Sequence, residues 1–388
     1  MLLKSLKLKD FLSFGDASRA LELRPLNVVI GANGSGKSNL VETIALLAAA
    51  SKDLLTPIRD GGGVRHWLWK GASTSPPTAS IDAVFAHPNG HSDLRYVLSF
   101  SEVAQRFAIQ GERVENAEPD PGHDKPQVYY RFDNGHGVLN VKGKERQLQH
   151  EDDALTSSIL ARRKDPDQYP ELTWLGNTLS RIRLYRQLCL TPTTPPRLPQ
   201  KADRSSDMLE ADAGNLALVI NRLRSSPPAK EKLLDALRTL YDGIEDVGVE
   251  VQGGTVQVFL QDGQTIIPAT RLSSGTLRYL CLLAILCHPS PPPLLCIEEP
   301  ELGLHPDVLP KLADLLRDAA ERTQLIVTTH SDVLVDALTD QPEAVVVAER
   351  SATETTLTRL DSEKLKPRLE KYRLGQLWTR GEIGGTRW

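Results

Sequence analysis

The sequence has few of the residues that mark disulfide-stapled or metal-binding proteins. It contains four cysteines and two methionines among 388 residues, and aromatic residues make up 5%. No two cysteines form a C-x-x-C pair, and Cys281, Cys287 and Cys296 lie in strongly apolar stretches. We therefore expect small core residues of a cytoplasmic protein, where thiols stay reduced, and neither zinc ligands nor disulfides.

Long apolar runs are also missing. No stretch approaches the roughly 20 residues of a membrane span. The longest candidate, Leu277–Cys287, includes Arg278 and is followed by a proline-rich break, so it predicts a buried helix. The first ten residues, MLLKSLKLKD, lack the apolar segment of a signal peptide. We expect no membrane partner.

The charge balance gives no global case for nucleic-acid binding, because the formal net charge is −4. Charged residues make up 25% and hydrophobic residues 40%, which is ordinary for a globular protein. Two local basic clusters leave two interpretations open, solvated helix faces or DNA contacts. These clusters are Arg162–Lys164 and the group Arg181, Arg183 and Arg186.

One stretch carries a specific chemical signal. Gly31–Ser38 is GANGSGKS, which fits the phosphate-binding pattern G-x-x-x-x-G-K-[ST]. The apolar run Leu26–Ile30 precedes it and predicts a buried strand, and Ser38–Ser51 has apolar residues at helical spacing. Strand, glycine-rich turn and helix together are the context that a P-loop requires.

The residue types of this loop suit ATP and Mg²⁺. Small residues let backbone N–H groups close around a phosphate, and the helix N-terminus adds partial positive charge. We expect Lys37, solvated before nucleotide binds, to reach the β/γ-phosphates, and the Ser38 hydroxyl to bind Mg²⁺. The predicted nucleotide-binding residues of this loop are Gly31, Asn33, Gly34, Ser35, Gly36, Lys37, Ser38 and Asn39.

The segment after the P-loop helix predicts an antiparallel meander within Ile81–Val141. Proline, glycine and asparagine turns separate its short alternating runs. A plain mononucleotide kinase would continue with parallel strands, so this pattern argues against that class. The predicted strands are Ser80–Ala86, Leu94–Ser101, Arg106–Gln110, Gln127–Phe132 and Gly137–Val141.

The second half brings three further motifs after a region that is mostly helical, with one helix predicted over Leu172–Leu190. LSSGT at Leu272–Thr276 opens an apolar helix. LLCIEEPE at Leu294–Glu301 is a buried strand that ends in adjacent acids. IVTTHS at Ile326–Ser331 is a second buried strand, followed by a histidine.

The order of these four elements resembles the ATP-binding-cassette (ABC) class of ATPases, and most closely its soluble SMC, RecF and overcoming-lysogenisation-defect (OLD) branches. The opening LKLKDFLSFGD is also similar to theirs. The resemblance covers the two ends of the chain and not its middle. It implies an α/β fold, a two-lobed ATP-binding-cassette head, or P-loop NTPase, with an antiparallel β meander and a helical insertion.

The resemblance assigns roles to the motifs of the second half. By position, Glu298 helps to hold Mg²⁺ and Glu299 polarises the attacking water. His330 is the switch residue that contacts the γ-phosphate, and Glu301–Pro306 (ELGLHP) matches the D-loop. LSSGT takes the place of the signature motif, where Ser273, Ser274 and Gly275 would contact the γ-phosphate bound to a second copy. The Q-loop glutamine stays open among Gln105, Gln110 and Gln127.

The resemblance also implies three parts of the chain. Residues 1–150 form an ATPase lobe with the P-loop and the antiparallel sheet, and 151–244 form a helical insertion. Residues 245–388 form an ATPase lobe with the signature, the Walker B acids Glu298 and Glu299, the switch histidine and a tail. In the tail, Trp378 and Trp388 could pack on the core or dock another protein, and both interpretations are open.

The implied activity is Mg²⁺-dependent ATP binding and hydrolysis by an ATP-sandwiched homodimer that drives or gates an effector. One hypothesis is a nuclease partner of the TOPRIM type supplied in trans, as in phage-defence modules. The alternative is a RecF-like DNA-repair ATPase that binds DNA directly. A transporter subunit is a third, less favoured hypothesis, since the chain shows no membrane helix.

Overall fold

The computed structural model describes residues 1–388 except 17, 72–76, 89, 91, 134, 142–143, 149–154, 189, 352–353 and 386–388. The chain divides into two compact units, each built from discontinuous segments. Unit 1 comprises Met1–Arg183, Glu343–Asp361 and Gly381–Trp388, and unit 2 comprises Leu184–Pro342 and Ser362–Arg380. The predicted insertion, 151–244, therefore contributes to both units.

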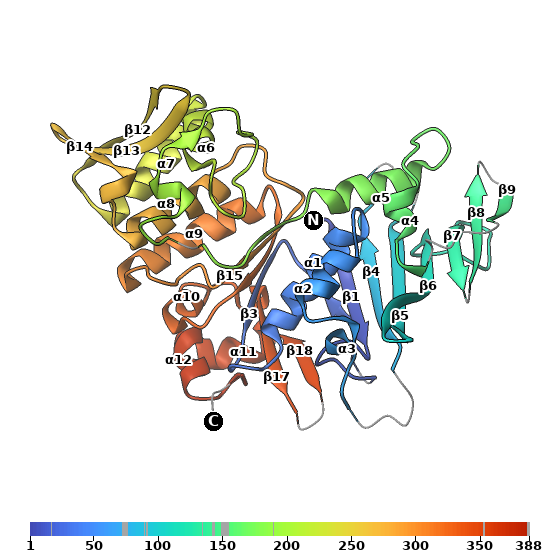
Figure 1. Cartoon of the computed structure of the whole chain (residues 1–388). Helices are drawn as coiled ribbons and strands as arrows, with labels where there is room; N and C mark the ends of the chain where they lie inside the picture. The colour runs from blue at the N-terminus through green and yellow to red at the C-terminus, as the bar shows by residue number, and fades with distance from the viewer. Residues whose placement is uncertain are drawn as a thin grey trace. The chain divides into compact units, whose positions relative to one another are not determined.

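Unit 1 is organised around an eight-stranded antiparallel sheet with the order β2-β1-β4-β5-β6-β7-β8-β9 (Figure 1). The predicted meander is confirmed, and β4 and most of β5 alternate between buried and half-buried residues, as expected for a sheet with one face in the core. Its strands are β1 (Leu3–Lys9), β2 (Leu21–Glu22), β4 (Ala79–Phe85), β5 (Leu94–Val103), β6 (Arg106–Asn116), β7 (Val128–Asp133), β8 (His136–Val141) and β9 (Lys144–Leu148).

A second group of strands in unit 1 positions the P-loop. Strand β3 (Leu26–Ile30) is buried at every residue and pairs in parallel with β17 (Val345–Arg350). Strand β17 turns back into the antiparallel β18 (Thr355–Arg359). The helices of this unit are α1 (Lys37–Ala50), α2 (Leu55–Asp60), α3 (Val64–Trp67), α4 (Ile159–Arg162) and α5 (Pro170–Ser180).

The helix predicted over Leu172–Leu190 is too long. Helix α5 ends at Ser180, and the chain then forms the short strand β10 (Arg183–Tyr185) at the boundary between the two units. Charged and apolar residues alternate from Arg181 to Leu184, and this period of two favours an extended chain over a helix.

Unit 2 contains a smaller antiparallel sheet, covered by helices (Figure 1). Strand β13 (Thr255–Asp262) pairs with β11 (Gln200–Lys201), β12 (Ile244–Gln252) and β14 (Thr265–Pro268). The helices of this part are α6 (Leu216–Arg224), α7 (Pro227–Leu240) and α8 (Ser274–Leu286), with the single turns η2 (Pro195–Arg197) and η3 (Ala269–Arg271).

The apolar run at Leu277–Cys287 is confirmed as a buried helix, because α8 is buried from Tyr279 to Leu286. Cys281, Cys287 and Cys296 are buried and free, and burial raises the pKa of the first two to about 12. Cys189 lies outside the described residues. Among the residues that the structure describes, no helix is long and apolar enough to cross a membrane.

The rest of unit 2 carries the acidic motif. Strands β15 (Leu294–Glu298) and β16 (Gln324–Thr328) are parallel and in register, so that Glu298 lies opposite Thr328. The remaining elements are η4 (Pro306–Val308), α9 (Leu309–Ala320), α10 (Asp332–Asp336), η5 (Pro342–Ala344, across the boundary), α11 (Ser362–Leu369) and α12 (Leu374–Thr379).

The tail packs against the element that follows His330. Helix α12 lies on α10, where Asp336 Oδ1 accepts the backbone N–H groups of Gly375 at 2.6 Å and Gln376 at 3.2 Å. Trp378 on α12 is buried, with 9% of its surface exposed. Of the two interpretations of the tail, packing on the core is therefore right for Trp378, whereas Trp388 lies outside the described residues.

Candidate nucleotide-binding and hydrolysis site

The P-loop joins the buried strand β3 to α1, which begins at Lys37. The N-cap residue of α1 is Gly36, with φ +104°. A Cβ atom there would lie 2.5 Å from Thr355 Oγ1, so both the backbone angle and the space require glycine. Asn33, Gly34 and Ser38 lie at the surface, and Gly31, Ser35 and Lys37 are buried.

Lys37 differs from the sequence-based expectation of a solvated side chain. It is only 6% exposed, and its Nζ donates to Gly31 O at 2.8 Å and to Ala32 O at 2.9 Å. Those two carbonyls belong to the first residues of the P-loop. The Lys37 ammonium group therefore connects the end of the loop to its start and is not surrounded by water. The expectation was wrong because a lysine that bridges loop carbonyls replaces its water with protein acceptors.

Two residues that the motif does not include support the loop. Thr355 Oγ1, at the start of β18, is hydrogen-bonded with Ser35 O at 2.9 Å and with Ser13 Oγ at 2.7 Å. Asn39 Nδ2, on α1, donates to the same Ser13 Oγ at 2.6 Å. Neither Ser13 nor Thr355 was predicted from the sequence as a site residue. The position of Ser13 in the opening LKLKDFLSFGD was the available signal for it, and nothing local marks Thr355.

One observation besides the motif indicates that the P-loop suits a phosphate group. Ser35 Oγ is buried, and no hydrogen-bond partner lies near it among the residues that the structure describes. A buried hydroxyl without a partner is unfavourable, and a phosphate oxygen is an acceptor that would satisfy it.

The acids of unit 2 meet at the carboxyl ends of β15 and β16. Glu298 is the last residue of β15, and Glu299 follows it in the left-handed region, with φ +46°. The Glu299 N–H donates to Thr328 O at 2.9 Å, and Glu299 Oε1 lies 3.6 Å from His330 Nε2. The structure therefore brings Glu299 and His330 together, and the backbone angle of Glu299 is uncommon for a residue other than glycine.

A third acid holds the switch segment in place. Glu301 Oε1 accepts the Thr329 hydroxyl and the His330 backbone N–H, each at 2.7 Å. Burial raises the pKa of the Glu301 carboxyl, and these two hydrogen bonds oppose that shift. Glu301 was predicted only as the start of the D-loop, and this contact was not foreseen, although the third acid of EEPE was an available signal.

The signature motif forms the N-terminus of α8. Ser273 is its N-cap, and its Oγ accepts the Thr276 N–H at 3.0 Å. A Cβ atom at Gly275 would lie 2.7 Å from Gly303 O, so only glycine lets the start of α8 pack against the D-loop. The amides of Ser274 and Gly275 lie in the first turn, where no intrahelical acceptor exists. Ser274 Oγ, in contrast, faces Arg197 Nη2 at 2.9 Å.

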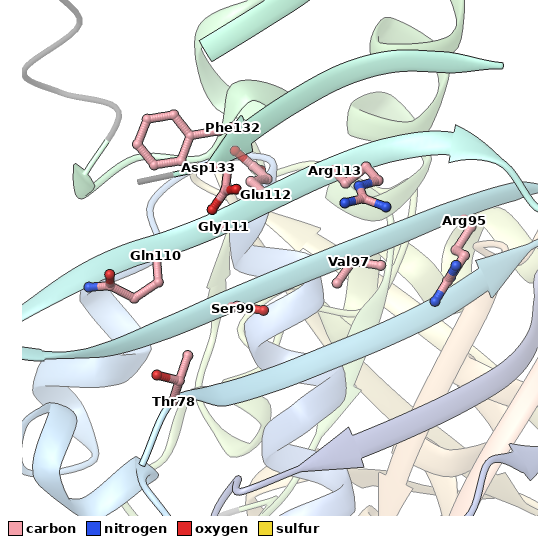
Figure 2. A pocket seen from close by; sticks show the side chains of 10 residues that line it. All are labelled: Thr78, Arg95, Val97, Ser99, Gln110, Gly111, Glu112, Arg113, Phe132 and Asp133. Atoms are coloured by element: carbon pink, nitrogen blue, oxygen red, sulfur yellow. The ribbon is translucent and has the colours of Figure 1, made fainter. Parts of the chain in front are cut away.

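The three glutamines proposed for the Q-loop lie in or beside the large antiparallel sheet. Figure 2 shows that Gln110 lines one end of a pocket of about 420 Å³ on that sheet, with Arg95 at the other end. Arg95 is already paired, with Asp82 at 2.5 Å and Glu115 at 3.1 Å. No P-loop residue lines this pocket, so its geometry does not select Gln110 as a nucleotide contact.

The comparisons with known proteins agree on the class. Residues 26–336, well over half of the chain, match the family described as "AAA domain, putative AbiEii toxin, Type IV TA system". The chain therefore belongs to this family and is a P-loop ATPase, which implies nucleotide binding. No curated protein matches the sequence.

Solved structures identify the fold. A crystal structure of an SMC head bound to the C-terminal winged-helix domain of ScpA has a TM-score of 0.57 at 14% identity, and the match covers 93% of this chain and 99% of that chain. The SMC head with an extended coiled coil, bound to the C-terminal domain of ScpA, derived from Pyrococcus furiosus, has a TM-score of 0.56 at 14% identity, covering 95% and 98%. An SMC head with coiled coil and joint from Pyrococcus yayanosii has a TM-score of 0.54 at 12% identity, covering 95% and 99%. The predicted fold, a P-loop NTPase of the SMC-head kind, is confirmed.

Proposed function

We propose that this protein is an ABC-class ATPase in which two copies enclose ATP between them. The observation that carries the proposal is the start of α8. It places Ser273 and Gly275 at the end of a 13-residue helix, with first-turn amides available to an anion and the D-loop packed beside them. In the ABC class, this motif completes the nucleotide site of a second copy. The P-loop of one copy would thus bind the nucleotide that the signature of the other contacts.

The residues of unit 2 would carry out hydrolysis. Glu299, which follows the last residue of β15, accepts a proton from the attacking water. His330 donates a hydrogen bond to the terminal phosphate, since Glu301 fixes its backbone. Glu301 touches neither water nor phosphate in this scheme, so we assign it a positioning role.

The donor set also fits Mg²⁺, which prefers oxygen ligands and retains several waters. Ser38, at the surface of the P-loop, offers a hydroxyl, and Glu298 offers a carboxylate. These two residues would hold the ion. When bound, Mg²⁺ would offset the negative charge that develops on the phosphate oxygens.

The effector is proposed on the resemblance and on the family description. That description names a toxin of a type IV toxin–antitoxin system, which suits an ATPase that controls a harmful activity. We propose a cytoplasmic ATPase that gates a nuclease or another nucleic-acid-directed effector protein in trans, in phage defence. Co-purification from the native host should recover that protein. DNA-stimulated hydrolysis without any partner would instead support direct DNA binding, as in a RecF-like repair ATPase.

Light scattering with and without ATP tests the sandwich. The Glu299→Gln variant should double its mass when ATP and Mg²⁺ are added, because slow hydrolysis preserves the bound state. Adding Ser273→Arg should abolish this change sterically while ATP still binds to the P-loop. Ser225→Arg, at the exposed end of α6, is the matched control and should behave like its parent. A mass that is unaffected by ATP in the Glu299→Gln protein would contradict the proposed dimer.

A further inference from the structure

One buried arginine is hydrogen-bonded to the signature motif. Arg197, at the end of η2, is only 7% exposed. Each of its three guanidinium nitrogens donates a hydrogen bond. Nε donates to Leu190 O at 3.1 Å, Nη1 to Leu272 O at 2.6 Å, and Nη2 to Ser274 Oγ at 2.9 Å. Two of these acceptors belong to LSSGT itself.

The acceptors of Arg197 are all neutral. Within the part of the chain that the structure describes, no carboxylate forms an ion pair with this side chain. Buried charges in proteins are ordinarily paired, because removing them from water is costly. Here the positive charge sits at the N-terminus of α8, where the helix dipole is also positive. Both would favour an anion at the start of α8.

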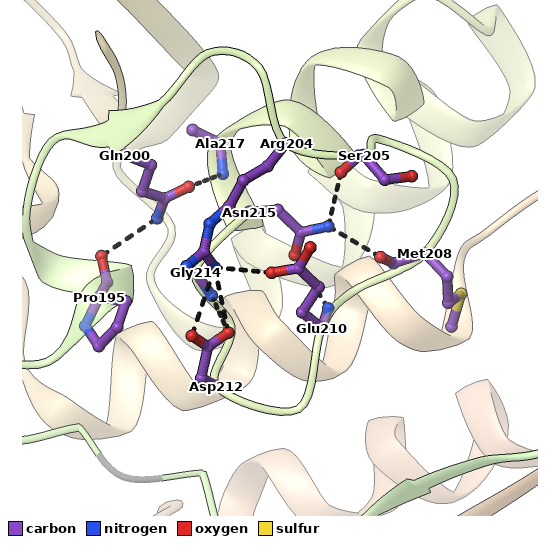
Figure 3. A network of polar contacts seen from close by, with 10 residues as sticks. All are labelled: Pro195, Gln200, Arg204, Ser205, Met208, Glu210, Asp212, Gly214, Asn215 and Ala217. Carbon is purple, nitrogen blue, oxygen red and sulfur yellow. Dashed lines mark hydrogen bonds and ion pairs between the residues drawn. The ribbon is translucent and has the colours of Figure 1, made fainter. Parts of the chain in front are cut away.

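Side-chain hydrogen bonds connect the residues on either side of Arg197 with α6 and β13, and Figure 3 draws those of Gln200. Gln200 Nε2 donates to Pro195 O at 3.3 Å, and Gln200 Oε1 accepts the Ala217 N–H at the start of α6 at 2.8 Å. Gln257 Nε2, from β13, bonds Arg197 O at 3.2 Å. The backbone around Arg197 is therefore connected by hydrogen bonds to α6 and β13, while its guanidinium bonds Leu190, Leu272 and Ser274.

Arg197 also explains a departure in the motif. The ABC signature ordinarily has glycine where this chain has Ser274. The Ser274 hydroxyl accepts from Arg197 and donates to Leu190 O at 3.3 Å, so it links the proline-rich segment to the first turn of α8. A glycine at this position would leave Nη2 without that acceptor.

We propose that Arg197 is a positioning residue of the signature motif, which orients LSSGT through Leu272 and Ser274 and adds positive charge for the terminal phosphate of a nucleotide bound to a second copy. This inference rests on the proposed function, because it assumes that α8 contacts a nucleotide across the dimer. It goes further by naming a residue outside the known motifs and the contact through which it acts.

The test uses the full chain carrying Glu299→Gln, so that hydrolysis does not obscure association. We expect Arg197→Met to weaken ATP-dependent dimerisation by about tenfold to a hundredfold, the range typical of hydrogen bonds from a charged donor. Arg197→Lys should give a smaller loss, since it keeps the charge but not the planar fork. The affinity of a single copy for ATP should be unchanged, because ATP binds to the P-loop, which lies in unit 1. Calorimetry at a protein concentration too low for dimerisation measures this affinity.

Two controls separate positioning from general stability. Arg204→Met removes an arginine of the same segment that pairs with Glu210 and Asp212, as Figure 3 shows. It should leave dimerisation unchanged. Ser274→Gly should cost several-fold by itself and little more when added to Arg197→Met, since both remove the same contact.

The outcomes are distinguishable. If the Glu299→Gln parent does not associate with ATP, the proposed function fails and this inference with it. If the parent associates and Arg197→Met associates equally well, the inference alone is overturned. It is also overturned if Arg204→Met weakens dimerisation as much as Arg197→Met, or if the effects of Arg197→Met and Ser274→Gly simply add.

Discussion

The P-loop in unit 1 and the acidic strand ends in unit 2 handle charge in opposite ways. The P-loop of unit 1 offers an anion backbone amides and one lysine, supported by the neutral side chains of Ser13, Asn39 and Thr355. The strand ends of unit 2 place three half-buried carboxylates within four residues. A dipole-based anion site needs the right shape, so it depends on glycine and close packing. A group of like charges needs hydrogen-bond donors instead, as Thr329 and His330 provide for Glu301.

The largest expected effect comes from the one lysine of the P-loop. Lys37→Ala should abolish tight ATP binding, because it removes the only side-chain cation of the loop. Since Lys37 also bridges Gly31 O and Ala32 O, we expect a small loss of thermal stability as well. Calorimetric titration with ATP and a melting curve test this, with the exposed Lys52→Ala as control. An unchanged ATP affinity would contradict the assignment of the P-loop.

Substitutions of the acids in unit 2 should have the reverse effect: ATP binding is retained and ATP hydrolysis is lost. Glu299→Gln should lower the hydrolysis rate by about 10²–10⁴-fold, the typical contribution of a general base. Glu298→Gln should instead weaken Mg²⁺ retention, so that added Mg²⁺ partly restores activity. Steady-state hydrolysis across Mg²⁺ concentrations separates the two roles. If only Glu298→Gln failed at every concentration, the roles would have to be exchanged.

The neutral support of the P-loop should contribute less than its lysine. Thr355→Val keeps the size of the side chain and removes hydrogen bonds to Ser35 and Ser13, each worth about 0.5–1.5 kcal/mol. We expect ATP to bind several-fold more weakly, while hydrolysis at saturation changes little. Thr356→Val, at the next and exposed position of β18, is the control. Equal ATP affinities for the two variants would show that the contact does not shape the loop.

The smallest effect should be a pH dependence of stability that originates at Glu301. Burial raises the pKa of this carboxyl in the folded state, so its stabilising effect is present at pH values below the ordinary glutamate pKa and is lost as pH rises through the raised value. Glu301→Gln stays neutral and can still accept both hydrogen bonds. Its unfolding free energy relative to wild type should therefore increase from pH 4 to pH 7.

Chemical denaturation at several pH values measures this difference. Glu321→Gln, at the exposed end of α9, controls for the loss of one charge. If Glu301→Gln and wild type kept a constant difference over this range, Glu301 would not titrate differently in the folded and unfolded states.

The sequence by itself determined the parts whose information is local. The P-loop, the acids after β15 and the histidine after β16 are each encoded by a short apolar run followed by specific polar residues, and the structure has each of them at the end of a buried strand. The antiparallel meander was also predictable from the sequence, since alternation and turn residues are properties of neighbours along the chain.

Only the tertiary structure decided how the motifs are supported. Thr355 meets Ser13 across 342 residues, and Arg197 meets Ser274 across 77. Glu301 reaches His330 over 29 residues, and α5 ends early because the next residues join a strand. Such contacts leave no periodic signal, because which side chains meet depends on the path of the whole chain and not on the spacing of residues within one element.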